Sequence, residues 1–344
     1  MNEINQKIID AIIRKSEAVC PDSLALIGLY GSVATGDIHE KSDLDLMIVI
    51  NDEHGWRLAD AFILNDVGIG YDIYCTSWNM LEEDAKCNHA HLSKLLDSPL
   101  VCIKEQSAVQ RLEGLRKKAF DLLASNERYQ KAQAAYENAK NRYADCFLSD
   151  SISKIRTDAG AVIHSLMDAV MLYHGKYFRY GVKRAFEELK ALDLSFNMEE
   201  KIMNIIRAET NAEIRTGLTD LMRNIQDLLL FPQEKAEPDP SNLAGTYEEI
   251  FSNWANKIQE ASDRQDVFSS FMNMVSFQSM MDEIAKNVAV NECDVMSGFD
   301  SHDVEHNWTI FENALNGYLD EYRKAGISPR CYENVNEFID HYLN

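Results

Sequence analysis

Short runs of apolar residues recur through the first hundred positions and are typical of buried strands. The runs cover residues 24–30, 44–50, 68–75 and 99–104. Isoleucines at helical spacing predict a helix over residues 2–19. Residues 52–66 are predicted to form a polar turn followed by a helix. Together these elements predict a small mixed β-sheet with helices packed on it.

Helical periodicity replaces these runs after about residue 107. The predicted helices cover residues 129–148, 152–173, 198–207, 212–230, 246–291, 303–324 and 334–343. Three of the six prolines fall within residues 231–240, which are interpreted as a linker. We therefore predict an α+β protein with a small mixed-sheet domain over residues 1–106, a large all-helical domain over 107–231, and a C-terminal helical extension over 244–344.

Two aspartates open the second apolar run, and a glycine–serine pair follows the first. Because strand side chains alternate between faces, Asp43 and Asp45 point to one side and the leucines beside them to the other. Two carboxylates on one face are hard oxygen ligands that suit Mg²⁺. The turn at Gly31 and Ser32, which opens a short helix, brings backbone N–H groups and a hydroxyl beside them. A phosphate can be held there.

A Gly-Ser turn followed by Asp-x-Asp resembles the DNA-polymerase-β-like nucleotidyltransferase superfamily. Residues 24–75 carry the resemblance, which is closest to the antibiotic adenylyltransferases of the aminoglycoside and lincosamide type. It implies that Asp43 and Asp45 are catalytic residues that bind Mg²⁺, and that Gly31 and Ser32 hold a nucleoside triphosphate, with ATP favoured. The implied reaction moves AMP onto a hydroxyl of a small, cationic acceptor such as an aminoglycoside, and so confers antibiotic resistance.

The resemblance also implies a third carboxylate, on a strand beside the Asp-x-Asp strand. Asp72 is the matching candidate, as a third metal ligand or as the base that takes the hydroxyl proton. Gly68 and Gly70 share its face of the predicted strand and leave room for a ligand. The alternative is that a single aspartate marks a strand edge or end.

The family pattern often has a basic residue just after Gly-Ser, where this chain has Val33 and Ala34. Lys41 is a candidate substitute, and a solvated loop lysine is the alternative. A second candidate grip on the triphosphate is the basic, aromatic stretch 174–184.

If that stretch is helical, Lys176, Arg179 and Lys183 fall on one face and can bind the nucleotide, with an aromatic ring stacked on the base. The alternative is a solvated face on which Lys183 pairs with Glu187.

The net charge of −22 repels a phosphate backbone, so a nucleic-acid substrate is disfavoured. The same charge attracts a polycationic small molecule, or serves only solubility. No apolar run reaches the ~18 residues of a membrane span. Seven scattered cysteines without metal spacing, and an N-terminus without signal-peptide features, indicate a cytoplasmic protein with reduced thiols.

Other function classes remain open. The runner-up is a nucleotidyltransferase that modifies a protein, or one of the toxin–antitoxin type, in which the helical part binds a partner protein. A non-catalytic module and a nucleic-acid polymerase or tRNA-tailing enzyme are less favoured. The C-terminal helices are expected to cover the substrate or to form a homodimer contact.

Three weaker features need an interpretation as well. His302 and His306 have the spacing of helical zinc ligands, although a charged helix start is favoured. Asp158 and Glu137, on long predicted helices, are candidates for the general base. The methionines and phenylalanines of residues 268–281 are expected to be core packing.

Overall fold

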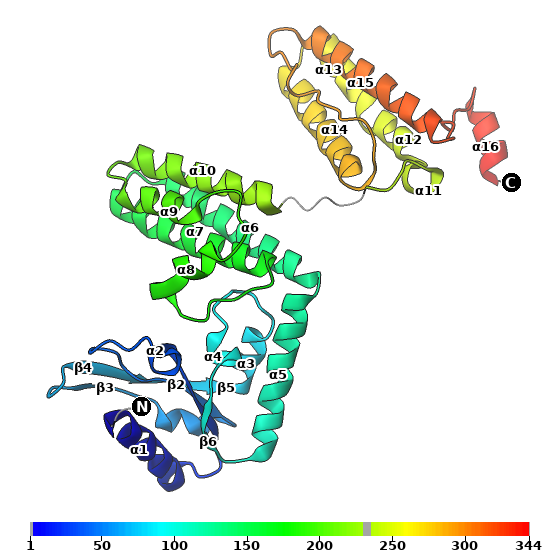
Figure 1. Ribbon diagram of the computed structural model, residues 1–344. Helices are drawn as coiled ribbons and strands as arrows, with labels where there is room; N and C mark the ends of the chain where they lie inside the picture. Colours follow the sequence, from blue (N-terminus) through cyan, green and yellow to red (C-terminus); the bar gives the residue numbers. More distant parts are fainter. Residues whose placement is uncertain (1–2, 230–234, 344) are drawn as a thin grey trace. The chain divides into compact units, whose positions relative to one another are not determined.

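The computed structural model describes residues 3–229 and 235–343 of the chain. It divides into two compact units, residues 1–230 and 231–344 (Figure 1). The first unit contains a small mixed sheet and a bundle of helices, and the second consists mainly of helices. The predicted α+β class is therefore confirmed.

The main sheet of the first unit has four strands in the order β5–β2–β1–β6. They are β1 (Leu24–Tyr30), β2 (Asp45–Ile50), β5 (Cys75–Ser77) and β6 (Leu100–Ile103). β1 is antiparallel to both β2 and β6, whereas β5 runs parallel to β2. The register pairs Tyr30 with Asp45, which places the end of β1 beside the start of β2.

Both faces of this sheet are covered, because β1 and β2 carry apolar residues toward both sides. Ile27 and Ile48 pack with the buried isoleucines of α1 (Glu3–Val19). Leu26 and Met47 belong to the core on the other side. Near the sheet, helices that contribute to this second core include α3 (Trp78–Asp84), α4 (Ser93–Leu96) and α5 (Gln106–Ala124), and the core continues into the later helices of this unit. Burial of each such side chain contributes about 1.5–3 kcal/mol.

One predicted element is wrong. Residues 52–66 form a 3₁₀ helix, Glu53–Leu58, and then the strand β3 (Asp60–Leu64), not an α-helix. β3 pairs antiparallel with β4 (Ile69–Ile73) in a separate two-stranded sheet, where Phe62 stacks on Tyr71 at 5.4 Å between ring centroids. Pairing with a neighbouring strand, which no local pattern encodes, overrides the local prediction.

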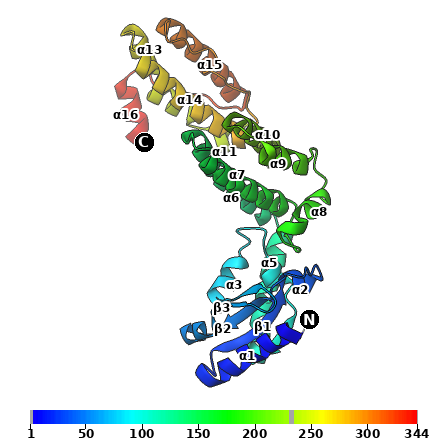
Figure 2. The ribbon, with the colours of Figure 1, turned by 90° about the vertical axis from the view of Figure 1, so that its left-hand side faces the viewer.

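The helical part of the first unit is built on a hairpin of α6 (Glu127–Leu148) and α7 (Ile152–Tyr173), which lie side by side in both views (Figures 1 and 2). Buried alanines at positions 132, 135 and 139 keep the helix surface small, so the two helices approach closely. The remaining elements are the 3₁₀ turn Val182–Arg184, α8 (Ala185–Lys190), α9 (Met198–Arg207) and α10 (Asn211–Leu229). The long helices match their predicted ranges closely.

The second unit has a core of its own, in which Phe277 and Phe311 meet edge to face at 4.9 Å. Its helices are α11 (Pro240–Leu243), α12 (Thr246–Ile250), α13 (Asn256–Asp263), α14 (Val267–Asn287), α15 (Val304–Lys324) and α16 (Val335–Leu343), with a π-helical turn at Phe251–Ala255. The helix predicted over 246–291 is thus broken after Asp263. Residues 231–234 of the predicted linker lie outside the described residues. None of the helices described here is long and apolar enough to span a membrane.

Candidate functional site

The candidate site begins where β1 ends. Gly31 opens the five-residue helix α2 (Gly31–Thr35) with φ +66°, a conformation that glycine adopts without strain. A Cβ atom at Gly31 would lie 1.9 Å from Oδ2 of Asp45. Any other residue at this position therefore displaces the Asp45 carboxylate. Ser32 follows in the first turn of α2 and is half-buried.

The predicted alternation along β2 is observed. Leu44 and Leu46 are buried, whereas Asp43 and Asp45 are half-buried on the other face. Burial, and to a lesser extent repulsion by Asp43, raises the pKa of Asp45 to about 6. No lysine, arginine or histidine of the described chain lies within 4.0 Å of Asp43, Asp45 or Asp72. These acids therefore lack a protein counter-ion, which suits a site for a divalent cation.

Asp72 lies on β4, exposed between the buried Tyr71 and Ile73. It is not on the strand beside β2, because that place is taken by β5, which follows β4 directly. Asp43, Asp45 and Asp72 do not bring three carboxylate oxygens within 4.8 Å of one another. The three acids line the same region. To share one ion, their carboxylate oxygens must move closer to one another.

Tyr30 is influenced by all three acids, whereas from the sequence it was predicted only as the end of a strand. Burial raises the pKa of Tyr30 to about 12, and the charges of Asp45, Asp43 and Asp72 add to the effect in that order. The phenol therefore stays neutral and lies within electrostatic range of all three carboxylates. In the sequence, its position directly before Gly-Ser was the one signal that Tyr30 belongs to this region. In the fold it pairs with Asp45.

Lys41 binds to the turn of the β3–β4 hairpin. Its Nζ donates a hydrogen bond of 2.8 Å to the backbone carbonyl of Val67. Val33 packs into the core beneath the sheet, and Ala34 is exposed. The loop after Gly-Ser thus has no basic side chain directly after the turn, and its one lysine already has a partner.

The stretch that carries Lys176, Arg179 and Lys183 is not a continuous helix. Lys176 and Arg179 lie in a loop after α7, and Lys183 lies in the 3₁₀ turn before α8. Lys176 and Arg179 line a pocket of about 610 Å³, and Lys183 does not. Arg179 also contacts Asp97, with its Nε 3.4 Å from Oδ2. The structure thus separates Lys183 from the other two.

The same pocket offers two aromatic rings and one carboxylate. Phe120 and Tyr177 meet there edge to face at 6.3 Å, and Glu188 completes the lining. Tyr177 donates a hydrogen bond of 2.8 Å to Asp97. The pocket therefore combines two cations with an aromatic wall.

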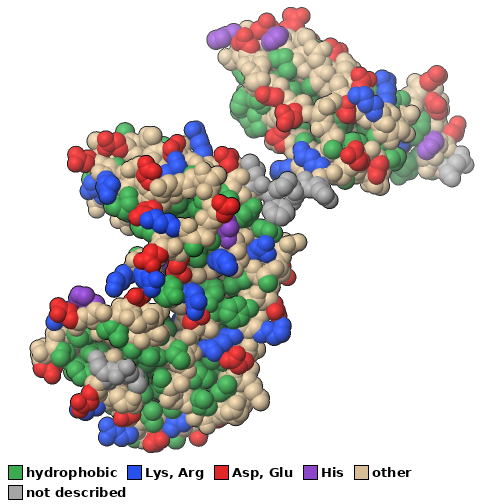
Figure 3. Space-filling model, in the orientation of Figure 1, with side chains coloured by type: hydrophobic (Ala, Val, Ile, Leu, Met, Phe, Trp, Pro, Cys, Tyr) green, Lys and Arg blue, Asp and Glu red, His purple; other side chains and the backbone are tan. Residues whose placement is uncertain are grey.

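Arg184 makes contacts that the sequence did not predict. It reaches Asp37, in the loop after α2, at 3.2 Å, and its Nε donates to Glu187 at 2.8 Å. Its guanidinium also covers the ring of Tyr180 at 4.1 Å. The predicted partner of Glu187 is therefore wrong, because Arg184 and not Lys183 pairs with it. Figure 3 shows Lys and Arg side chains around α8 with acidic side chains among them.

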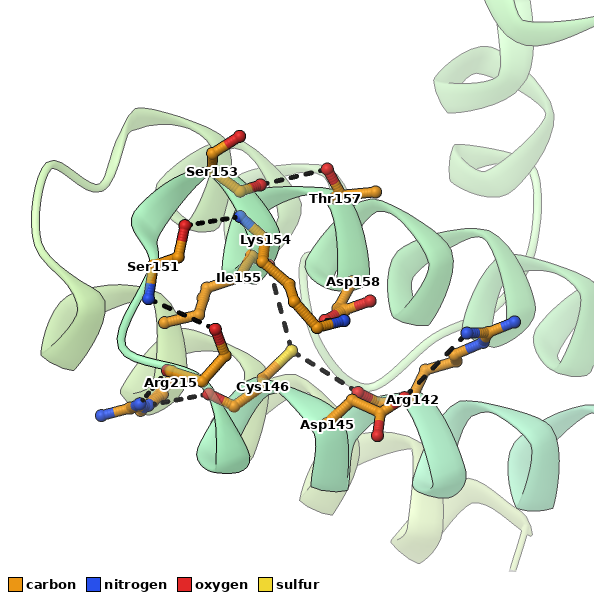
Figure 4. A network of polar contacts seen from close by, with 11 residues as sticks. Arg142, Asp145, Cys146, Ser151, Ser153, Lys154, Ile155, Thr157, Asp158 and Arg215 are labelled. Carbon is orange, nitrogen blue, oxygen red and sulfur yellow. Dashed lines mark hydrogen bonds and ion pairs between the residues drawn. The ribbon is translucent and has the colours of Figure 1, made fainter.

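The two candidates for a general base on the long helices both have partners. Asp158 is buried at the α6–α7 junction, where Nζ of Lys154 lies 3.0 Å from its carboxylate (Figure 4). The Cys146 thiol sits in the same network and donates to the carbonyl of Arg142. Glu137 pairs with Lys140 at 2.9 Å on the surface of α6. These contacts favour structural roles.

Comparison with known proteins locates one domain. Residues 7–96, which contain Gly31, Asp45 and Asp72, match the family model described as "Nucleotidyltransferase domain". The chain is also similar to the crystal structure of a nucleotidyltransferase-like protein from Exiguobacterium sibiricum 255-15. That likeness has 14% identity and a TM-score of 0.38, and it covers 96% of each chain. No protein with a curated description matches the sequence.

Proposed function

We propose that this enzyme, a transferase whose residues 7–96 form a nucleotidyltransferase domain, moves AMP from ATP onto a hydroxyl of a small cationic molecule. One observation carries the proposal: Asp45 is half-buried against Gly31 and beside Asp43, with no protein cation to neutralise it. A partly buried charge of this kind lowers the stability of the fold unless a bound ligand neutralises it.

Asp43 and Asp45, with Asp72, are the residues that would hold Mg²⁺. Magnesium bound there would offset the negative charge that builds on the phosphoryl oxygens during in-line displacement. The fit rests on the donor set, because carboxylate oxygens without a counter-ion are what Mg²⁺ prefers. Ser32 and the first turn of α2 would face the phosphates.

The proposed step breaks one bond and forms one. The acceptor hydroxyl oxygen bonds to the α-phosphorus of ATP, and the bond from that phosphorus to the pyrophosphate oxygen breaks. Asp72 has one of two roles, either third metal ligand or base, and as the base its exposed carboxylate takes the hydroxyl proton. Tyr30, kept neutral by its raised pKa, lies within electrostatic range of the same three carboxylates.

The acceptor class follows from charge. The chain carries a net charge of −22, which favours a cationic sugar-like acceptor over a nucleic acid. Lys176 and Arg179 line a pocket with Phe120 and Tyr177, which supports a role for that pocket in holding the anionic nucleotide. Lys183, outside that pocket, is retained as a weaker nucleotide ligand.

The test is pyrophosphate release from ATP and Mg²⁺ with a panel of aminoglycosides, with lincosamides, and with no acceptor. We expect turnover that depends on a cationic acceptor and on Asp45. ATP turnover that is equal with and without every acceptor would contradict the proposed acceptor class. An undiminished rate in the Asp45→Asn variant would contradict the site itself.

A protein acceptor is the second candidate function, and one observation favours it. Phe268, Phe271 and Met272 of α14 are exposed, although the sequence analysis expected core packing there. Met274, Phe277 and Met281 on the same helix are buried as expected. Transfer of label from α-phosphate-labelled ATP to a protein, with no small acceptor active, would support this alternative.

A further inference from the structure

A second group of ligand-type side chains lies apart from the three aspartates. His91 comes from the segment before α4, and His164 and Asp168 come from α7. Nε2 of His91 is 3.7 Å from Oδ1 of Asp168, and Nδ1 of His164 is 3.5 Å from Oδ2. The three candidate ligand atoms all lie within 4.8 Å of one another, and no other group in the described ranges meets that distance.

The carboxylate of this group is held in place. The Asp168 side chain is 8% exposed, and its Oδ1 accepts a hydrogen bond of 2.8 Å from the backbone N–H of Ala90. The His91 ring stacks on His164 at 4.6 Å and on Phe178 at 5.0 Å. Outer contacts of this kind orient metal ligands in proteins.

One atom of the group is unexplained by the protein alone. Nε2 of His91 is buried and has no hydrogen-bond partner in the part of the chain that the structure describes. Buried polar atoms almost always have a partner, and a bound ion is one physical explanation for an exception. Burial also lowers the pKa of His91, which favours the neutral imidazole that ligates metals.

We propose that His91, His164 and Asp168 bind a divalent transition-metal ion of the Zn²⁺ type, with water as the fourth ligand. Two imidazoles and one carboxylate suit zinc, whereas Mg²⁺ prefers oxygen ligands throughout.

The candidate ligand atoms need to move only a little closer together to form this site. Bonds of about 2.0–2.1 Å in a tetrahedron place ligand atoms about 3.4 Å apart, and the two histidines lie 3.7 Å and 3.5 Å from different oxygens of Asp168. The remaining approach of the ligand atoms falls to His164, whose side chain is 57% exposed and whose ring stacks on His91.

The ion has a structural consequence. It ties the segment around His91 to α7, and the stacked Phe178 connects this clamp to the loop that carries Lys176 and Arg179. The backbone N–H of Phe178 also donates to the carbonyl of Ala90 at 2.8 Å. We therefore assign the ion a role in holding that loop, separate from phosphoryl chemistry.

The experiment measures zinc binding by the full chain, with excess Mg²⁺ present to occupy the aspartates. Isothermal titration with Zn²⁺ alone as the ligand gives stoichiometry and affinity, and Co²⁺ substitution gives the visible bands of a tetrahedral site. We expect one bound ion, a raised melting temperature, and a loss of affinity of more than about 100-fold in His164→Ala. His164 is exposed, so this variant should fold, which far-UV circular dichroism checks.

His306→Ala is the matched control, because His306 and His302 form the competing histidine pair in the second unit. We expect its zinc affinity and cobalt spectrum to equal those of the wild type. Equal zinc binding in the wild type and His164→Ala overturns the proposal, as does loss of zinc only in His306→Ala. Catalytic activity enters none of these readouts, so the result stands apart from the fate of the proposed reaction.

Discussion

Two aspartates of the first unit, Asp45 on β2 and Asp158 on α7, lie in opposite electrostatic settings. The Asp158 side chain is 8% exposed, and Lys154 neutralises it at 3.0 Å. Burial, and to a lesser extent repulsion by Asp43, raises the pKa of Asp45 to about 6, and no cation lies beside it within the described chain. A charge left uncompensated lowers stability, whereas a paired one need not. We therefore expect Asp158 to serve the fold, and Asp45 fits the ligand-binding role proposed for it.

The largest expected effect that tests this contrast is the loss of transfer in Asp45→Asn. The substitution keeps the shape of the side chain and removes its charge, so the positive charge it would hold is lost. We expect kcat/KM to fall by about 1,000-fold, which corresponds to about 4 kcal/mol of transition-state stabilisation. Pyrophosphate release with a fixed acceptor measures it.

The same substitution, which is expected to lower activity, is expected to raise stability. Because the Asp45 charge is uncompensated, we expect the metal-free variant to melt at a higher temperature than the wild type. Mg²⁺ should raise the melting temperature of the wild type and leave that of Asp45→Asn nearly unchanged. If both proteins respond equally to Mg²⁺, then Asp45 is not a ligand.

A second prediction concerns the contact behind Asp45. In Gly31→Ala, the new Cβ would meet Oδ2 of Asp45 at 1.9 Å, so the carboxylate must move. We expect activity to fall by about 100-fold, since small misplacements of reacting groups have effects of this size. Pyrophosphate release under saturating ATP measures the change.

Gly36→Ala is the matched control for that prediction. Gly36 also has a positive φ, +82°, but nothing lies within 4 Å of a Cβ placed there. The control therefore has the same backbone strain, about 1 kcal/mol, without the collision. A similar loss of activity in both variants would mean that strain, and not the position of Asp45, is responsible.

The contrast between local and distant contacts also explains what the sequence could predict. β1, β2, the turn at Gly31 and the facing of Asp45 follow from residues adjacent in the chain, and these predictions agree with the structure. The prediction of a helix where β3 lies is wrong because the five residues of β3 do not by themselves determine its pairing with β4.

Pairings across long stretches of sequence were beyond such reasoning. Arg184 meets Asp37 across 147 positions, and Ala90 meets Asp168 across 78. Only the folded chain selects Arg184 rather than the neighbouring Lys183, because both lie in one short basic run. Periodicity predicts elements, whereas the packing of those elements decides which of several similar charges has a partner.

A third prediction tests the structural role of Asp158. In Asp158→Asn, the ion pair with Lys154 is lost while the buried site keeps a polar side chain. We expect the free energy of unfolding to fall by about 1 kcal/mol, and the melting temperature by about 2–4 °C. Activity per folded molecule should stay unchanged. A large fall in kcat at full stability would instead make Asp158 a member of the active site.

The last prediction concerns the dependence of stability on pH, which reports the charge state of Asp45 directly. Its pKa is about 6 in the folded protein and near 3.8 as the ordinary value. Between these values the folded state binds more protons than the unfolded state, so stability falls as pH rises. The contribution of Asp45 is present below about pH 4 and is lost as pH rises through about 6.

We therefore expect the wild type to lose stability relative to Asp45→Asn by about 1 kcal/mol between pH 4 and pH 7, after allowing for solvent screening at a half-exposed carboxylate. Urea unfolding of both proteins over this range, without Mg²⁺, measures the difference. A constant gap between wild type and Asp45→Asn from pH 4 to pH 7 would place the Asp45 carboxylate in an ordinary, solvated setting and remove the contrast with Asp158.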